Sequence, residues 1–313
     1  MEYRTLGRTG LRVSLAGLGT GGPSRLGQSA GVPAAESHRV VRTALDLGIN
    51  FFDTSPAYRG SEELLGAALD GVPRDRYALS TKFPPGREGS LKTDPEDLMR
   101  TLEKSLRLLR IDCVDVLEYH AVSPAIYRAV VDRFHPVALR AQEQGKVRFL
   151  GITETVSDDP THAMLQVAIP EGLFDVVMIK YGILNQTAAD TVLPLAKEHN
   201  VGVQIMATVR TSLRNPEEAV RTINRFIDEG LLDAPRPSLD DPLGLGATGD
   251  PAPSLTRAAY QFAADHEAVS SVLIGTGSAD HLRANVADLL GERLPQAQFD
   301  HLRRVYGGLA WNA

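Results

Sequence analysis

The chain has 313 residues, of which 43% are hydrophobic and 23% charged, so it can bury a full globular core. Its formal net charge is -6 and Lys and Arg do not cluster, which argues against nucleic acid as a partner. The first residues contain no apolar leader and no stretch approaches 18 apolar residues, so we expect no membrane contact and a soluble cytoplasmic protein.

Short apolar runs alternate along the chain with longer segments of helical periodicity. Gly48 follows the first of these helical segments, and Ser61 begins the second as a candidate N-cap with acidic residues in the first turn. Strands are predicted at 14–19, 50–54, 77–82, 114–120, 147–153, 174–180, 201–207 and 269–275. Helices are predicted at 36–48, 61–71, 93–110, 129–145, 161–169, 188–200 and 278–290.

Eight short strands that are apolar on both faces, each followed by helical material, indicate a parallel and buried sheet. The fold class is therefore α/β, and we expect a (β/α)₈ TIM barrel that spans residues 1–313 as a single domain. A doubly wound sheet is the alternative. It would require a Gly-rich phosphate turn that opens a helix, whereas the "GLGTGG" stretch at 17–22 leads into a loop.

Two segments lie outside the repeat. Residues 3–13 read as two short strands around "GRTG", which predicts a β-hairpin before the first barrel strand. A long insertion of about 210–255 follows the seventh strand and contains a predicted helix at 215–230. Residues 231–254 are rich in Pro, Gly and Asp, which is typical either of a functional loop, such as a lid, or of a poorly ordered segment.

Polar residues gather where the predicted barrel strands end, which is where barrel enzymes carry their chemistry. Asp53 ends the second strand and Tyr58 follows in its loop, while Lys82 and His120 end the third and fourth. Each residue alone has an ordinary structural explanation, such as a turn cap, a packing aromatic, a surface lysine or a buried histidine. Their occurrence at successive strand ends favours a catalytic set.

The chemistry of this set is coherent. Tyr58 is a weak acid, and an ammonium close by favours phenolate, so Lys82 is expected to lower the pKa of Tyr58. Asp53 would hold Lys82 charged and in place, and His120 would polarise a substrate oxygen by a hydrogen bond. The set can protonate a carbonyl oxygen but holds no strong nucleophile, so hydride from a nicotinamide cofactor is the expected attacking group.

These residues resemble the aldo-keto reductase superfamily. The segment "GINFFDTSPAYRGSEELLG" at 48–66 is similar to the first signature of that family, and 80–82 and 114–120 supply the matching Lys and His. The hairpin at 3–13 fits as well, because the family closes the bottom of its barrel with one. The resemblance covers the chain except roughly 210–256. It implies an NAD(P)H-dependent reductase of aldehydes or ketones with the catalytic residues Asp53, Tyr58, Lys82 and His120.

The resemblance also assigns cofactor-binding positions, with departures from the family pattern. Thr153 and Glu154 stand where an amide usually contacts the nicotinamide, Met178 replaces a Gln, and His281 stands where an Arg often binds the 2'-phosphate. Arg210 could reach the pyrophosphate, and a surface role is equally open. The implied cofactor residues are Gly19, Thr20, Asp53, Thr153, Glu154, Met178, Tyr181, Thr208, Arg210, Gly275, Thr276, Gly277, Ser278, His281 and Asn285. The implied cofactor is NADPH, with NADH possible.

Two other function classes remain open. A barrel of this family could bind the cofactor and act as a sensor or partner subunit with little catalysis, which the changes at Glu154 and Met178 would suit. A metal-dependent barrel is disfavoured, because no His-X-His follows the first strand. A small-molecule carbonyl substrate would be selected by the loops 21–34 and 121–127, by the insertion and by Trp311 in the C-terminal tail.

Overall fold

The computed structural model describes residues 1–155 and 157–309, and the predicted candidate Trp311 lies outside them. The strands are β1 (Tyr3–Thr5), β2 (Arg12–Ser14), β3 (Ala16–Gly19), β4 (Phe51–Asp53), β5 (Ala78–Phe83), β6 (Val114–Val122), β7 (Val147–Glu154), β8 (Val176–Lys180), β9 (Gly202–Met206) and β10 (Ser271–Ile274). The α-helices are α1 (Ala34–Asp46), α2 (Ser61–Leu69), α3 (Asp97–Leu109), α4 (Pro124–Glu143), α5 (Ala163–Ala168), α6 (Val192–Glu198), α7 (Pro216–Asp228), α8 (Leu255–Ala264), α9 (Ala279–Leu290) and α10 (Gln296–Tyr306).

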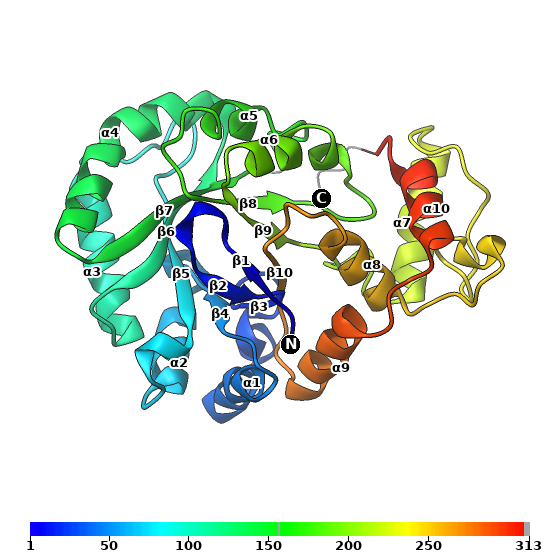
Figure 1. Ribbon diagram of the computed structural model, residues 1–313, viewed down its shortest axis with the longest axis horizontal. Coiled ribbons are helices and arrows are strands. Elements are labelled where there is room, and N and C mark those ends of the chain that lie inside the picture. The colour runs from blue at the N-terminus through cyan, green and yellow to red at the C-terminus, as the bar shows by residue number, and fades with distance from the viewer. Residues whose placement is uncertain (156, 310–313) are drawn as a thin grey trace.

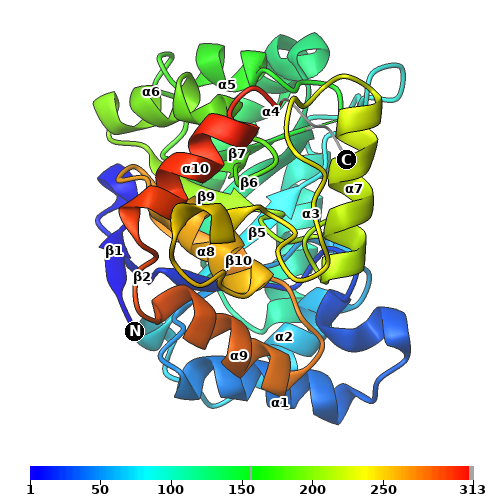
Figure 2. The ribbon, with the colours of Figure 1, turned by 90° about the vertical axis from the view of Figure 1, so that its right-hand side faces the viewer.

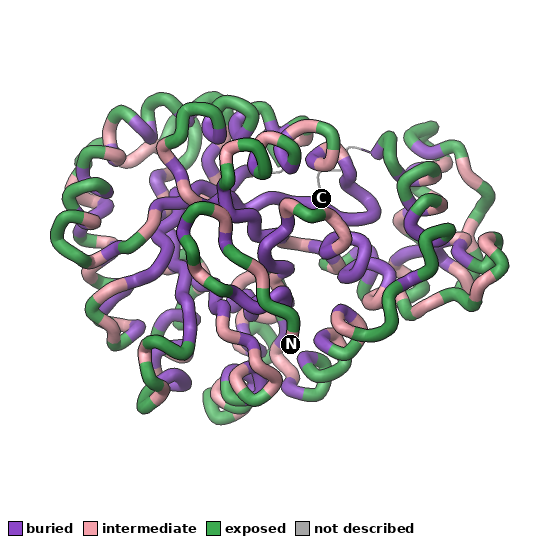
Figure 3. The backbone as a smooth tube through the Cα atoms, viewed as in Figure 1, coloured by how far each residue is buried: buried purple, intermediate pink, exposed green. Residues whose placement is uncertain are grey.

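Strands β3 to β10 form a closed parallel barrel in the order β10-β3-β4-β5-β6-β7-β8-β9. Helices surround the strands, as Figure 1 shows, and the predicted TIM barrel is confirmed. In Figure 3 the strands are largely buried, whereas the helices alternate between buried and exposed residues. This pattern follows from period 3.6, because only one stripe of each helix faces the barrel.

The predicted N-terminal hairpin is also confirmed, with β1 antiparallel to β2. Leu6 and Val13 of this hairpin segment pack with Phe51, Val116 and Val176 in a separate apolar cluster, to which Ala78 also belongs. We call these six residues the lower core. They are all buried, so the hairpin supplies part of the packing at one end of the barrel.

The insertion after β9 is packed against the C-terminal helix. Its helix α7 begins after Asn215, whose side chain accepts a hydrogen bond from the Glu218 N–H at 2.9 Å, as expected for an N-cap. Further on, the carbonyl of Leu243 accepts hydrogen bonds from α10, including one from the Tyr306 hydroxyl at 3.3 Å. In Figure 2, α7 and α10 both lie on the flank of the barrel that faces the viewer, with the yellow connecting loop between them.

Two helices were not predicted from the sequence. Helix α8 comes directly after the Pro- and Gly-rich stretch and packs against α9 and β10. Helix α10 holds the insertion in place. Within the described residues, no helix is both long and apolar enough to cross a membrane.

Candidate active site

A buried ion pair lies at the C-terminal edge of the barrel. Asp53 is the last residue of β4, and Lys82 lies near the end of the neighbouring strand β5; both side chains are buried. The Lys82 ammonium donates hydrogen bonds to Asp53 Oδ1 and, at 2.9 Å, to the carbonyl of Thr54. Burial alone would lower the pKa of Lys82, but the charges of Asp53 and other neighbours outweigh burial and raise it. Lys82 is therefore charged at any working pH.

Tyr58 stands over this pair. It ends a short 3₁₀ turn, η3 (Pro56–Tyr58), that follows β4, and the Lys82 Nζ lies 5.2 Å from the centre of its ring. The ring of His120 meets the Tyr58 ring edge to face, with 5.6 Å between the centroids. Gly21 lies against the other side, because a Cβ at this position would come within 2.5 Å of the Tyr58 Cζ. The structure thus brings all four predicted catalytic residues together.

Burial and three neighbouring charges act on the pKa of Tyr58. Burial raises it most; Lys82 lowers it, and the negative charges of Asp53 and Glu118 raise it again, so the net shift is upward. The predicted effect of Lys82, which lowers the pKa of Tyr58, therefore has the expected direction, but burial and the two carboxylates outweigh it. Tyr58 consequently carries its proton at neutral pH.

His120 is neutral, and Ser55 orients it. Burial and, after it, the charge of Lys82 lower the pKa of His120 to about 3. The Ser55 Oγ lies 3.1 Å from His120 Nδ1, and it also accepts a hydrogen bond from the Ala57 N–H. Ser55 was not among the residues found from the sequence. The available signal was its place as the N-cap of the turn that carries Tyr58.

Glu118 is a second buried carboxyl beside Lys82 that sequence reasoning missed. Its Oε2 lies 3.6 Å from the Lys82 Nζ, and its side chain is fully buried. The available signal was an acidic residue in the middle of a buried strand, two positions before His120 and hence on the same face of β6.

A pocket of about 570 Å³ extends away from Tyr58. Its walls come mainly from the loop after β3, the segment after β9, helix α8 and the first two turns of α9. The predicted residues that line it are Gly19, Asp53, Tyr58, Met178, Thr208, Arg210, Gly275, Thr276, His281 and Asn285. Lys82 and His120 are not among its lining residues and lie behind Tyr58.

The pocket fits a nicotinamide dinucleotide. The hydroxyl of Thr208, which lines the pocket, is buried and has no hydrogen-bond partner among the described residues, so it is available to a ligand. The predicted Thr20 also has a buried hydroxyl without a partner among these residues, but Thr20 does not line the pocket. At the far end, helix α9 is capped by Ser278, whose Oγ accepts from the His281 N–H at 3.3 Å, and Gly277 precedes this cap. A helix N-terminus favours an anion such as a phosphate.

Three predicted cofactor residues have other partners. The Thr153 hydroxyl accepts a hydrogen bond from the Ala121 N–H at 2.7 Å. The carboxylate of Glu154 contacts His162 Nδ1 at 2.6 Å and accepts from the Lys180 N–H. The ring of Tyr181 packs against Phe262 of α8, with 5.7 Å between centroids. The structure does not bring these three side chains to the large pocket, so a charge at Glu154 does not face it.

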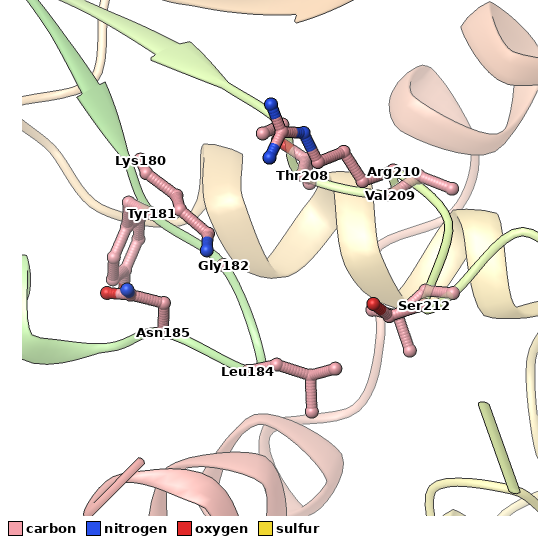
Figure 4. A pocket seen from close by; sticks show the side chains of 11 residues that line it. Lys180, Tyr181, Gly182, Leu184, Asn185, Thr208, Val209, Arg210 and Ser212 are labelled. Atoms are coloured by element: carbon pink, nitrogen blue, oxygen red, sulfur yellow. The ribbon is translucent and has the colours of Figure 1, made fainter. Parts of the chain in front are cut away.

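A second, narrow cavity of about 20 Å³ adjoins the large pocket (Figure 4). Lys180, the last residue of β8, and Arg210, in the segment after β9, both line this cavity. Burial and then the charge of Arg210 lower the pKa of Lys180 to about 8. Lys180 was not found from the sequence, because it reads there as the end of an apolar strand.

Comparison with known proteins agrees with the aldo-keto reductase resemblance of the sequence. The model of the Aldo/keto reductase family matches residues 17–306. L-galactose dehydrogenase of Arabidopsis thaliana is 33% identical over 295 residues, which are 92% of this chain and 88% of that protein. NADH-specific methylglyoxal reductase of Escherichia coli (strain K12) is 28% identical over 236 residues, covering 68% of this chain and 69% of that protein.

The same architecture occurs among solved structures. The holo form of an aldo-keto reductase from Bacillus halodurans superposes with a TM-score of 0.72 at 23% identity, covering 97% of this chain and 96% of that one. At this identity the likeness shows the fold, whereas the family match extends over nearly the whole sequence. The chain belongs to the aldo/keto reductase family and is an NAD(P)H-dependent oxidoreductase.

Proposed function

We propose that the protein reduces an aldehyde or ketone to an alcohol, with Tyr58 as the proton donor. The observation that carries the proposal is the arrangement at one end of the large pocket. There the charged Lys82, held by Asp53, faces the ring of Tyr58, and the neutral His120 meets that ring edge to face.

Each residue has a distinct part in this reaction. NAD(P)H, when bound, supplies the hydride that reaches the carbonyl carbon. The hydroxyl of Tyr58 gives its proton to the carbonyl oxygen, and the Lys82 charge stabilises the phenolate left behind. If Ser55 donates to His120 Nδ1, the ring proton of His120 resides on Nε2, where it can hydrogen-bond to the substrate oxygen.

We propose NADPH as the preferred cofactor, with NADH as the alternative. Arg210, Arg214 and His281 line the pocket, and Asp53 is the only carboxylate among the described residues that do so. A cofactor pocket that selects NADH commonly presents a carboxylate to the ribose hydroxyl, whereas cationic side chains suit the 2'-phosphate of NADPH. Fluorescence titration of the protein with each cofactor tests this preference, and tighter binding of NADH would contradict it.

The variant Tyr58→Phe tests the proton donor. It should abolish reduction of a panel of aldehydes, ketones and sugars, while the dissociation constant for NADPH should change by less than about threefold because the phenyl ring is retained. Tyr3→Phe is the matched control, because its hydroxyl bonds to the Gly48 carbonyl in the hairpin region, away from the pocket. Turnover by Tyr58→Phe at the wild-type rate would refute the assignment.

A second candidate is the reverse reaction on a sugar, the oxidation of an alcohol or hemiacetal with NAD(P)+. The relative L-galactose dehydrogenase, which matches 92% of this chain, supports this candidate because it is named for a dehydrogenation of a sugar. The two candidates use the same residues, since Tyr58 would then accept the proton. Screening aldoses with NAD(P)+ and carbonyls with NAD(P)H separates them. Cofactor binding without turnover in either direction would favour the sensor alternative.

A further inference from the structure

Glu118 occupies an unusual place for a carboxyl group. It lies in the middle of β6, points into the barrel and is completely buried. Removing a carboxylate from water carries a large desolvation penalty unless partners compensate it, and an apolar side chain would normally fill such a position. The reaction described above makes no use of Glu118.

Residues of three other strands, β5, β7 and β9, leave room for the Glu118 side chain or hydrogen-bond to it. In the barrel register Glu118 lies beside Lys82 on β5 and Gly151 on β7. A Cβ at Gly151 would come within 2.9 Å of the Glu118 Cγ, so the glycine leaves room for the carboxyl group. Ser80 Oγ donates to Glu118 Oε2 at 2.9 Å, and Gln204 Nε2 donates to Oε1 at 3.0 Å. These contacts hold both oxygens and keep Oε2 3.6 Å from the Lys82 Nζ.

The ionisable groups that act on Glu118 belong to the catalytic set. Burial raises the pKa of Glu118 to about 7, with Lys82 lowering it and Asp53 raising it. Ionised Glu118 in turn raises the pKa of Tyr58. His120 lies on the same strand and is neutral across the working pH range. The described neighbours of the Glu118 side chain on β7 and β9 are Gly151 and Gln204, which carry no charge.

We propose that Glu118 is a positioning residue of the reduction, which acts through Lys82 and controls how readily Tyr58 gives up its proton. The proposal rests on the proposed function of Tyr58 as the proton donor. When Glu118 is ionised, Lys82 is shared between two carboxylates and Tyr58 faces a net negative cluster. When Glu118 is protonated, more of the Lys82 charge is available to the developing phenolate, so proton transfer becomes easier.

The proposal predicts a pH dependence with a definite sign. Glu118 is protonated below about pH 7 and ionised above it, so the kcat for carbonyl reduction should fall as the pH rises through this value. A change of about one unit in the pKa of Tyr58 corresponds to a roughly three- to tenfold change in the rate of proton transfer. KM should stay constant, because Glu118 is not among the residues that line the pocket.

The decisive variant is Glu118→Gln, which keeps the shape and removes the charge. The amide of Gln204 can turn to meet it, since its Oε1 is buried without a partner among the described residues. With 4-nitrobenzaldehyde and saturating NADPH, wild-type kcat should fall between pH 6 and pH 8, whereas kcat of Glu118→Gln should remain at the low-pH level. Glu118→Asp should restore the pH step, because it restores a carboxylate.

A second measurement does not need turnover. Ultraviolet difference titration, with Tyr58→Phe subtracted as the background, follows formation of the Tyr58 phenolate. Glu118→Gln should shift this transition to lower pH by about one unit. A uniform loss of kcat at every pH together with an unmoved Tyr58 titration would mean a purely structural role and would overturn the proposal. If the wild type reduces no carbonyl, the proposed function fails, and the titration still decides whether Glu118 acts on Tyr58.

Discussion

The variant Gly21→Ala tests whether the placement of Tyr58 limits the reaction. A Cβ at this position would meet three ring atoms of Tyr58, at 2.5, 2.6 and 2.9 Å. Carbon atoms in contact prefer about 3.5–4.0 Å, so the ring must move by roughly 1 Å. A displacement of this size at a reacting group costs about 10²-fold in rate, which corresponds to about 2.7 kcal/mol of transition-state stabilisation.

The assay is kcat at saturating cofactor and carbonyl substrate, with thermal unfolding as a check on folding. Gly308→Ala is the matched control, because the added Cβ meets nothing within 4 Å and Gly308 does not line the pocket. In a Tyr58→Phe background, Gly21→Ala should cause little further loss, since the donor is already absent. A kcat for Gly21→Ala within threefold of the wild type, or losses that multiply in the double variant, would refute this reasoning.

Two further predictions concern buried charges. Lys82→Met should abolish reduction. It should also lower the free energy of unfolding by about 3–5 kcal/mol, because Asp53 is left as a buried carboxylate without its cation. Denaturant unfolding measures this loss of stability, and an unchanged midpoint would contradict the prediction. The pKa of His120 is about 3 in the folded state, below its ordinary value of 6.5. Between these two pH values the imidazole is therefore protonated in the unfolded chain and neutral in the folded one. The contribution of His120 to stability should therefore fall with decreasing pH by up to about 1.4 kcal/mol per unit between these values, opposite in sign to that of Glu118, whose pKa is raised. The difference in unfolding free energy between the wild type and His120→Phe should change with pH by this amount, and a pH-independent difference would contradict it.

The repeating pattern and the catalytic motif were predictable from local signals. Strand and helix positions follow from hydrophobic periodicity, and Asp53 and Tyr58 lie within one short motif. Asn215 is the N-cap of α7, as predicted. Helix α2 begins at Ser61, but Gly60 occupies its N-cap position, and the Ser61 hydroxyl donates to the carbonyls of Thr20 and Tyr58. The features that were predictable depend on residues close together in the chain.

The remaining features depend on register and burial, which a single sequence does not reveal. Glu118 meets Lys82 because their strands are neighbours in the closed barrel with these two residues side by side. Glu154 turns to His162, in the loop that follows β7, although it stands where a cofactor contact was expected. The sign of the Tyr58 pKa shift required the depth of burial and a third charge, and neither can be read from the motif.

The lower core affects which residues of this protein can be substituted without loss of the fold. The hairpin, β4, β5, β6 and β8 meet there in apolar contacts that involve no catalytic side chain. The polar groups of the reaction lie toward the opposite ends of the same strands. Amide hydrogen exchange should be slowest in the lower core, because opening it requires global unfolding. Residues around the pocket can then be exchanged during evolution, or in a mutagenesis library for new substrates, while the packing of the lower core is retained. Leu273 is the exception among the described residues, because it lines the pocket and also packs against the lower core.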